Sequence, residues 1–262
     1  MGAADVEVSA VRYPGREERI AEPIPTRMAD LAGPLADALA PWTTTCTTVF
    51  FGHSMGASVA HEVAALLAAR GDRGPAALFV SGRAAPHRLR RVGNGDLPDE
   101  QLLTEVSELG GPGADALREP ELRDLVLPPI RADYQLVDAY AAGPKAGALD
   151  VPVVAYLGES DPGPTPDDVR AWSQLTTAAA TPSPTRATTS SWCRTARPSS
   201  AISARAWRDS AERLGPVRRD FGCGPSLPPA AASALRARPQ TPDGLMWLSS
   251  ATTSPSGGTA QR

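Results

Sequence analysis

The sequence predicts an α/β domain built on a mostly parallel sheet, and two observations lead to that prediction. Short apolar runs at residues 6–11, 49–51 and 76–82 have the length and composition of strands. Stretches with helical periodicity separate them, and this alternation favours parallel strands joined by right-handed crossovers. The 262 residues, of which 42% are hydrophobic, are enough for one such domain.

The spacing of apolar residues and the positions of glycine and proline indicate where each element begins and ends. After the strand at 6–11, a Pro-Gly pair marks a loop at 13–19. Leu31, Leu35 and Leu39 recur at helical spacing within a helix predicted over 28–39. A second helix follows Ser54 and is expected to end near Gly71.

The pattern changes after the third strand, because three helical segments follow one another without a strand. They are predicted over 97–109, 120–127 and 130–141, with a Pro-Pro pair between the last two. Ligands of open α/β folds bind at the carboxyl edge of the sheet, so we expect a lid over that edge at about 97–145. The alternative is a set of ordinary packing helices. A further strand is predicted over 151–157, and a helix begins near residue 166.

The segment Gly52-His53-Ser54-Met55-Gly56 connects the second strand to its helix. This G-x-S-x-G pattern, in strand–turn–helix context, is typical of a nucleophile elbow. The predicted turn strains the serine backbone, and the two glycines relieve crowding where strand and helix approach. Ser54 is then the candidate nucleophile, and the amide of Met55 is a candidate donor to an oxyanion. The alternative is a chance Gly-Ser turn.

Asp161 lies just beyond the strand at 151–157 and downstream of Ser54. A carboxylate in this place suits the acid of a catalytic triad in the order Ser, Asp, His. The alternative is that Asp161 only caps a turn before Pro162.

Composition excludes several function classes. A net charge of -3 gives no reason to expect nucleic acid or an anionic membrane as partner. No apolar stretch is long enough to span a bilayer, and no secretory signal is present. Three widely spaced cysteines form neither a disulfide framework nor a metal-ligand pattern, which favours a reducing cytoplasm. We expect no metal and no bound cofactor.

Four separate segments resemble the type II thioesterases, the stand-alone editing enzymes of polyketide and nonribosomal peptide assembly lines. They are the elbow, the Tyr-Pro-Gly-Arg-Glu loop at 13–17, the Ser-Gly-Arg-Ala-Ala-Pro-His segment at 81–87 and Arg-Ala-Asp-Tyr at 131–134. The resemblance covers about residues 6–175. It implies an α/β-hydrolase fold with a helical lid, and hydrolysis of aberrant or stalled acyl groups from the phosphopantetheine arm of acyl or peptidyl carrier proteins. It also implies Ser54 as nucleophile, Asp161 as acid and Met55 as oxyanion donor.

The histidine that such a triad needs has no candidate at the expected place. The chain has only His53, His61 and His87, and none of them follows Asp161. His53 is interpreted as structural, His61 as a packed or partly exposed helix residue, and His87 as part of a solvated basic loop with its neighbouring arginines. We therefore expect the chain as written to be impaired.

Residues 177–262 form a tail rich in Thr, Ser, Pro, Ala and Arg, unlike the core at 1–176, and its composition predicts disorder. A change of reading frame between about residues 175 and 188 explains this tail and the missing histidine together. Residues 187–195, written in suitable codons and read from the third base, translate as Asp-His-Phe-Phe-Leu-Val-Pro-His. The family typically carries such a segment, with the catalytic histidine, at this point. The family begins with a strand and a Phe-Pro-His-Ala-Gly-like oxyanion loop, which would precede residue 6. We expect either that the start is placed too late or that the chain lacks this part of the sheet and half of its oxyanion hole.

Two other functions stay open at this stage. One is a non-catalytic protein that still docks carrier domains. The other is a different serine hydrolase, an esterase or an acyltransferase, which the loop at 13–17 and the segment at 131–134 make less favourable because they accompany the elbow.

Overall fold

The computed structural model describes residues 6–108, 119–142, 146–158, 161, 163–178, 180–185 and 245–250. Six strands form one sheet in the order β1-β6-β2-β3-β4-β5. Their bounds are β1 Val6–Ala10, β2 Thr48–His53, β3 Ala77–Ser81, β4 Val153–Gly158, β5 Ala180–Thr185 and β6 Leu245–Ser250. Neighbours from β2 to β5 are parallel, whereas β6 runs antiparallel to both β1 and β2. The predicted α/β fold with a mostly parallel sheet is confirmed.

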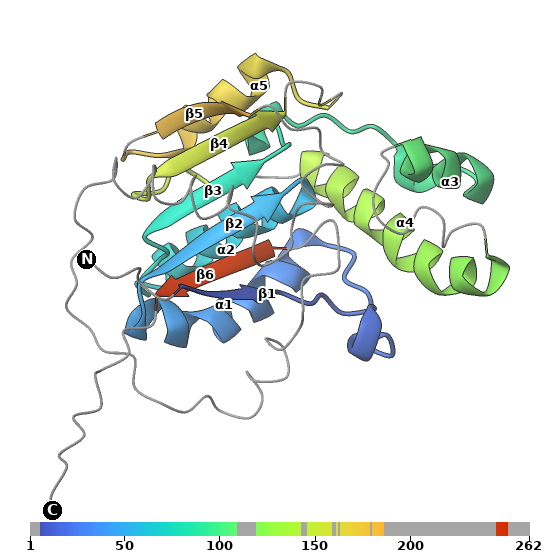
Figure 1. Ribbon diagram of the computed structural model, residues 1–262, viewed down its shortest axis with the longest axis horizontal. Helices are drawn as coiled ribbons and strands as arrows, with labels where there is room; N and C mark the ends of the chain where they lie inside the picture. The colour runs from blue at the N-terminus through green and yellow to red at the C-terminus, as the bar shows by residue number, and fades with distance from the viewer. Residues whose placement is uncertain are drawn as a thin grey trace, which may run out of the picture.

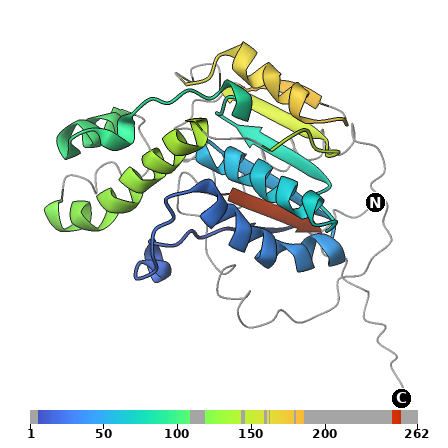
Figure 2. The same cartoon turned by 180° about the vertical axis from the view of Figure 1, so that it is seen from behind.

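Helices α1 (Met28–Thr45), α2 (Met55–Ala69) and α5 (Pro166–Arg170) lie against one face of this sheet, as Figures 1 and 2 show from opposite sides. Alternate strand residues such as Phe50 and Leu78 pack against them in the main core. The residues between these, including Val49 and Phe79, form a second cluster. Successive side chains of a strand point to opposite faces of the sheet, so the two clusters lie on its two faces.

Helix α1 is longer than the sequence predicts. It continues to Thr45 although Pro34 and Pro41 lie within it. The hydroxyls of Thr44 and Thr45 donate to carbonyl oxygens one turn back, each at 2.8 Å, so the last turn satisfies its own polar side chains. The threonines therefore continue the helix instead of ending it.

Helices α3 (Asp99–Glu108) and α4 (Pro120–Ala142) extend beyond the carboxyl ends of the strands (Figure 1). The prediction of two helices over 120–141 was wrong, because α4 continues through Pro128 and Pro129. Packing on both sides of the prolines explains this: Leu127 is buried against α3, and Arg131 donates to the carbonyl oxygens of two residues before α3. That the two helices act as a lid stays a prediction.

Two strands lie in the stretch that the sequence predicts to be irregular. β5 continues the sheet beyond β4, and β6 occupies the position between β1 and β2. At both positions the neighbouring strands have backbone N–H and C=O groups that an added strand can hydrogen-bond. Residues 186–244 and 251–262 lie outside the described residues, so the division at residue 176 stays a prediction.

The other structural elements are short. One-turn 3-10 helices lie at η1 (Glu17–Arg19), η2 (Pro86–Arg88) and η3 (Asn94–Asp96), and η5 (Ala171–Leu175) continues α5. Cys46 is disulfide-bonded, a bond that the wide spacing of the three cysteines did not indicate. No helix in the described part of the chain is both long and apolar enough to cross a bilayer.

Candidate active site

Ser54 occupies a sharp turn between β2 and α2, as the sequence predicts. Its backbone has φ 49° and ψ -119°, a combination that a residue with a side chain rarely adopts. Its amide donates to the carbonyl oxygen of Ser81, at the end of the neighbouring strand, over 2.9 Å. The turn is thus fixed to the carboxyl edge of the sheet, and its strain is of the kind found at functional sites.

Gly52 and Gly56 allow β2 and α2 to meet at this turn. A Cβ atom on Gly52 would lie 2.2 Å from the carbonyl oxygen of Gly56 and 2.5 Å from the amide nitrogen of Ala57. No side chain fits at position 52 without moving backbone atoms. The close approach places the start of α2 directly over the end of β2.

Met55 is the first residue of α2 and is buried. Amide groups in the first turn of a helix have no acceptor within that helix. The Met55 amide can therefore donate a hydrogen bond to an acceptor beside Ser54, where the helix dipole also favours negative charge.

Asp161 follows β4 at the same edge of the sheet. Its Oδ1 accepts the amide of Gly163 at 2.9 Å, and the residue is half-buried. Gly82, with φ +58°, lies close to both Asp161 and the elbow: a Cβ atom there would be 3.1 Å from Asp161 Oδ2 and 2.6 Å from His53 Cε1. The structure therefore brings Asp161 and the elbow histidine close to the same glycine.

The three histidines differ in their surroundings. His53 is buried, with Nδ1 3.2 Å from the hydroxyl of Ser81. His61 is fully buried on α2 and meets Trp172 edge-on, with ring centroids 5.7 Å apart. His87 is exposed on η2. The base of a Ser-Asp-His triad would follow Asp161 in the chain, and none of the three histidines lies there.

A buried polar network that the sequence does not indicate joins α2 to the end of α4. Glu62 Oε1 accepts the hydroxyl of Tyr140 at 2.6 Å and the amide of Ala146 at 3.2 Å. Burial alone would raise the pKa of Glu62, but its interactions with His61, Tyr140 and the amide of Ala146 outweigh burial and hold that pKa below its usual value. His61 Nδ1 lies 3.7 Å from Glu62 Oε1, beyond hydrogen-bond distance, so its effect on the carboxylate is electrostatic. Burial raises the pKa of Tyr140, which keeps its hydroxyl a donor.

Arg83 lies in the loop after β3 and close to this network. Its Nε donates to the hydroxyl of Ser58 at 3.3 Å, and burial lowers the pKa of Arg83 to about 10. Its carbonyl oxygen accepts the indole N–H of Trp172 at 2.9 Å. The loop that follows β3 is thereby fixed to both α2 and η5.

Arg16 and Asp133 form an ion pair between the loop at 13–17 and α4. The guanidinium of Arg16 also lies over the ring of Tyr13, 5.4 Å from its centroid. These contacts hold the Tyr-Pro-Gly-Arg-Glu loop against the Arg-Ala-Asp-Tyr segment of α4, which their sequence separation does not indicate.

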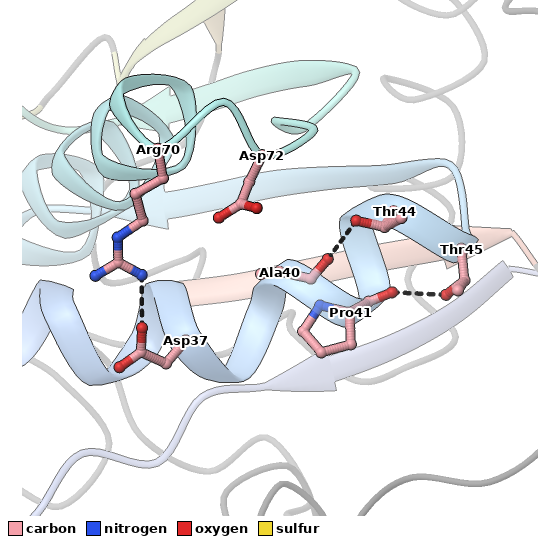
Figure 3. A pocket seen from close by; sticks show the side chains of 7 residues that line it. All are labelled: Asp37, Ala40, Pro41, Thr44, Thr45, Arg70 and Asp72. Carbon is pink, nitrogen blue, oxygen red and sulfur yellow. Dashed lines mark hydrogen bonds and ion pairs between the residues drawn. The ribbon is translucent and has the colours of Figure 1, made fainter.

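A surface cavity of about 450 Å³ lies far from Ser54. Figure 3 shows it between the last turns of α1 and α2, where Arg70 pairs with Asp37. Ser54 is at the opposite end of α2, about 22 Å away along a 15-residue helix. This cavity is separate from the elbow. The described residues contain no cluster of three or more side chains that could hold a metal ion.

A parallel sheet with a strained serine between β2 and α2, and an aspartate beyond β4, defines the α/β-hydrolase class of folds. Residues 2–192 match the model of the thioesterase domain family. The chain belongs to this family.

Individual relatives agree with this assignment. The chain is 39% identical over 171 residues to thioesterase PikA5 of Streptomyces venezuelae, covering 65% of this chain and 60% of that protein. It is 32% identical over 173 residues to the gramicidin S biosynthesis protein GrsT of Aneurinibacillus migulanus, covering 66% and 67%. The chain thus spans less than two thirds of the length of PikA5.

Solved structures give the same result. The RedJ thioesterase from the prodiginine biosynthetic pathway in Streptomyces coelicolor matches with a TM-score of 0.60 and 37% identity, over 66% of this chain and 65% of that one. ClbQ from the colibactin NRPS/PKS pathway matches with a TM-score of 0.68 and 28% identity, over 78% and 86%.

Proposed function

We propose that this protein is a thioesterase that removes aberrant or stalled acyl groups from the phosphopantetheine arm of carrier proteins in polyketide or nonribosomal peptide biosynthesis. The observation that carries the proposal is the backbone of Ser54, strained at φ 49° and tied to Ser81 at the carboxyl edge of the sheet. Membership of the thioesterase family supports the choice of a thioester as substrate.

The proposed reaction is acyl transfer in two steps. Ser54 Oγ attacks the thioester carbonyl carbon, and the Met55 amide donates to the oxyanion. The carbon–sulfur bond breaks, the pantetheine thiol leaves with a proton, and an ester to Ser54 remains. Water then hydrolyses this ester, releasing the carboxylic acid and restoring the hydroxyl. Asp161 is the acid that would hold a base in its tautomer.

The base is the part that this chain does not supply. Removal of the histidine from a triad reduces turnover on the order of a millionfold. We infer a change of reading frame between about residues 175 and 188, because residues 187–195, written in suitable codons and read from the third base, translate as a segment that contains a histidine. The chain as written is then an impaired thioesterase with its nucleophile elbow retained.

Carrier proteins bearing acyl-phosphopantetheine are the partners that follow from this substrate, and the cytoplasm is the proposed place of reaction. The disulfide at Cys46 is unusual for that compartment. The absence of a suitable histidine favours a second candidate function, a non-catalytic protein that binds carrier domains.

Release of free thiol from an acyl-carrier protein tests the proposal and separates the two functions. Slow release that Ser54→Ala abolishes would support the thioesterase. Binding of the carrier without release, unchanged in Ser54→Ala, would support the docking protein. A preference for simple oxygen esters would contradict both.

A further inference from the structure

The loop after β3 carries a concentration of positive charge for which neither the fold nor the proposed reaction accounts. Residues 82–95 contain four arginines and no acidic residue. Arg83 is buried in the polar network, and Arg91 forms an ion pair with Asp96 at 2.7 Å. Arg88 and Arg90 are exposed and, within the described part of the chain, their side chains form no ion pair or hydrogen bond. They stand apart from most other described arginines, which are paired with carboxylates.

The two free arginines lie near the catalytic edge of the sheet. The loop leaves that edge at Gly82, beside Asp161, and the amide of Ala85 donates to the carbonyl oxygen of Asp168 on α5 at 3.0 Å. The pKa of Asp168 is lowered mainly by its hydrogen bonds with Thr165, and the nearby charges of Arg88 and Arg90 lower it further. The guanidinium groups are therefore close to the first turn of α5.

A groove of about 300 Å³ opens beside Arg88 and runs along α5 and η5. The lining residues include several hydrogen-bond donors and a single acidic residue, Asp167. They are Arg88, Asp167, Arg170, Ala171, Ser173 and Gln174. The charge of Asp167 is balanced within the groove, because Arg170 forms an ion pair with it. The guanidinium of Arg88, the hydroxyl of Ser173 and the amide of Gln174 remain as donors.

This set of donors fits a phosphate group. Guanidinium groups bind phosphate oxygens through paired, charge-assisted hydrogen bonds, and hydroxyl and amide donors can complete the shell. The volume lies at the lower end of the range for ligand sites and suits a small polar group.

The substrate class of the proposed function has an anion of this kind. A phosphopantetheine arm carries a phosphodiester at one end and the thioester at the other, separated by a flexible chain. When the thioester lies at Ser54, the phosphodiester must lie at some distance from it, towards the outside of the site. We propose that Arg88, Arg90 and the groove along α5 bind the phosphodiester of the phosphopantetheine arm. This inference rests on the proposed function.

The direct test compares two soluble probes, octanoyl-4′-phosphopantetheine and octanoyl-pantetheine, by calorimetric titration of the Ser54→Ala chain, which binds them without hydrolysis. We expect the phosphorylated probe to bind roughly tenfold tighter at low ionic strength, and salt to reduce the difference. With Arg88→Ala and Arg90→Ala combined, we expect the two affinities to become equal.

Arg91→Ala is the matched control, because Arg91 lies in the same loop but is paired with Asp96. We expect it to keep the preference for the phosphorylated probe. Thermal unfolding of each variant checks that the fold is unchanged, as exposed side chains should allow.

Four results would overturn the inference. Equal binding of the two probes to the parent chain would contradict the phosphate site while leaving the proposed function standing. A preference unchanged by the double substitution would place the phosphate elsewhere. An effect of the substitutions on an intact carrier protein but not on the probes would assign the basic surface to the carrier protein itself. Failure of both probes to bind would contradict the proposed function, and with it the inference.

Discussion

Gly52 and Gly56 are in backbone contact: a Cβ atom on Gly52 would lie 2.2 Å from the carbonyl oxygen of Gly56. The contact places the first turn of α2 over the end of β2 and leaves Ser54 at the turn between them. The pair of glycines is thus a geometric requirement of the elbow, independent of what Ser54 does chemically.

Substitution of Gly52 by alanine should therefore destabilise the fold severely. We expect Gly52→Ala to lower the free energy of unfolding by about 3 kcal/mol or more, because backbone atoms must move to admit the methyl group. Urea denaturation measures the change. Gly33→Ala in α1 is the control: no atom lies within 4 Å of its Cβ, so it should stabilise the helix by up to about 1 kcal/mol. Equal midpoints for the Gly52→Ala chain and the parent would show that the contact is not required.

Gly82→Ala tests the packing around Asp161. Two effects add at this position, the positive φ of 58° and the approach of His53 Cε1 to 2.6 Å. Gly71→Ala shares the positive φ, at 74°, but has nothing within 4 Å. We expect about 1 kcal/mol of destabilisation for Gly71→Ala and about 2–3 kcal/mol for Gly82→Ala. If the two variants unfold at the same urea concentration, His53 and Asp161 do not crowd Gly82.

The Glu62–Tyr140 hydrogen bond should couple α2 to α4. We expect Tyr140→Phe to cost about 1–2 kcal/mol of unfolding free energy, because a half-buried carboxylate loses a donor. A double-mutant cycle with Glu62→Gln should give a coupling energy of similar size. Additive effects of the two substitutions would contradict the contact.

The same contact predicts a pH dependence. Because the folded-state pKa of Glu62 is lowered, its contribution is present above the unfolded pKa, near 4.5, and is lost as the pH falls through the lower folded value. The stability difference between the parent and Tyr140→Phe should therefore be full at pH 7 and should shrink below about pH 4.5. A difference that grows as the solution becomes more acidic would reverse the assigned direction.

The elbow and Asp161 could be placed from the sequence because local patterns determine them: a strand, a glycine, a serine and a helix in one case, and the end of a strand in the other. The contacts around them could not. Glu62 and Tyr140 are 78 residues apart, and nothing in the pattern around either residue indicates the other.

Helix α4 and strand β6 show the same limit. Pro128 and Pro129 predict a break, and only tertiary packing on both sides keeps α4 continuous. Residues 245–250 carry no sign in the sequence of the sheet position that they fill, because the position is defined by the unpaired edges of β1 and β2.

Resequencing the gene tests the proposed change of reading frame. We expect a coding sequence in which one frame, entered before about residue 188, encodes Asp-His-Phe-Phe-Leu-Val-Pro-His. A gene in which no frame encodes that histidine segment would remove the explanation for the tail after residue 176.

The central claim is that Ser54 is the nucleophile of a thioesterase site whose base is missing from the chain as written. The most direct measurement is the rate at which a fluorophosphonate labels Ser54, with Ser54→Ala as the control. We predict weak or no labelling of this chain, and clear labelling of a chain in which the histidine segment is restored. Strong labelling of the chain as written, abolished by Ser54→Ala, would contradict the claim that the base is missing.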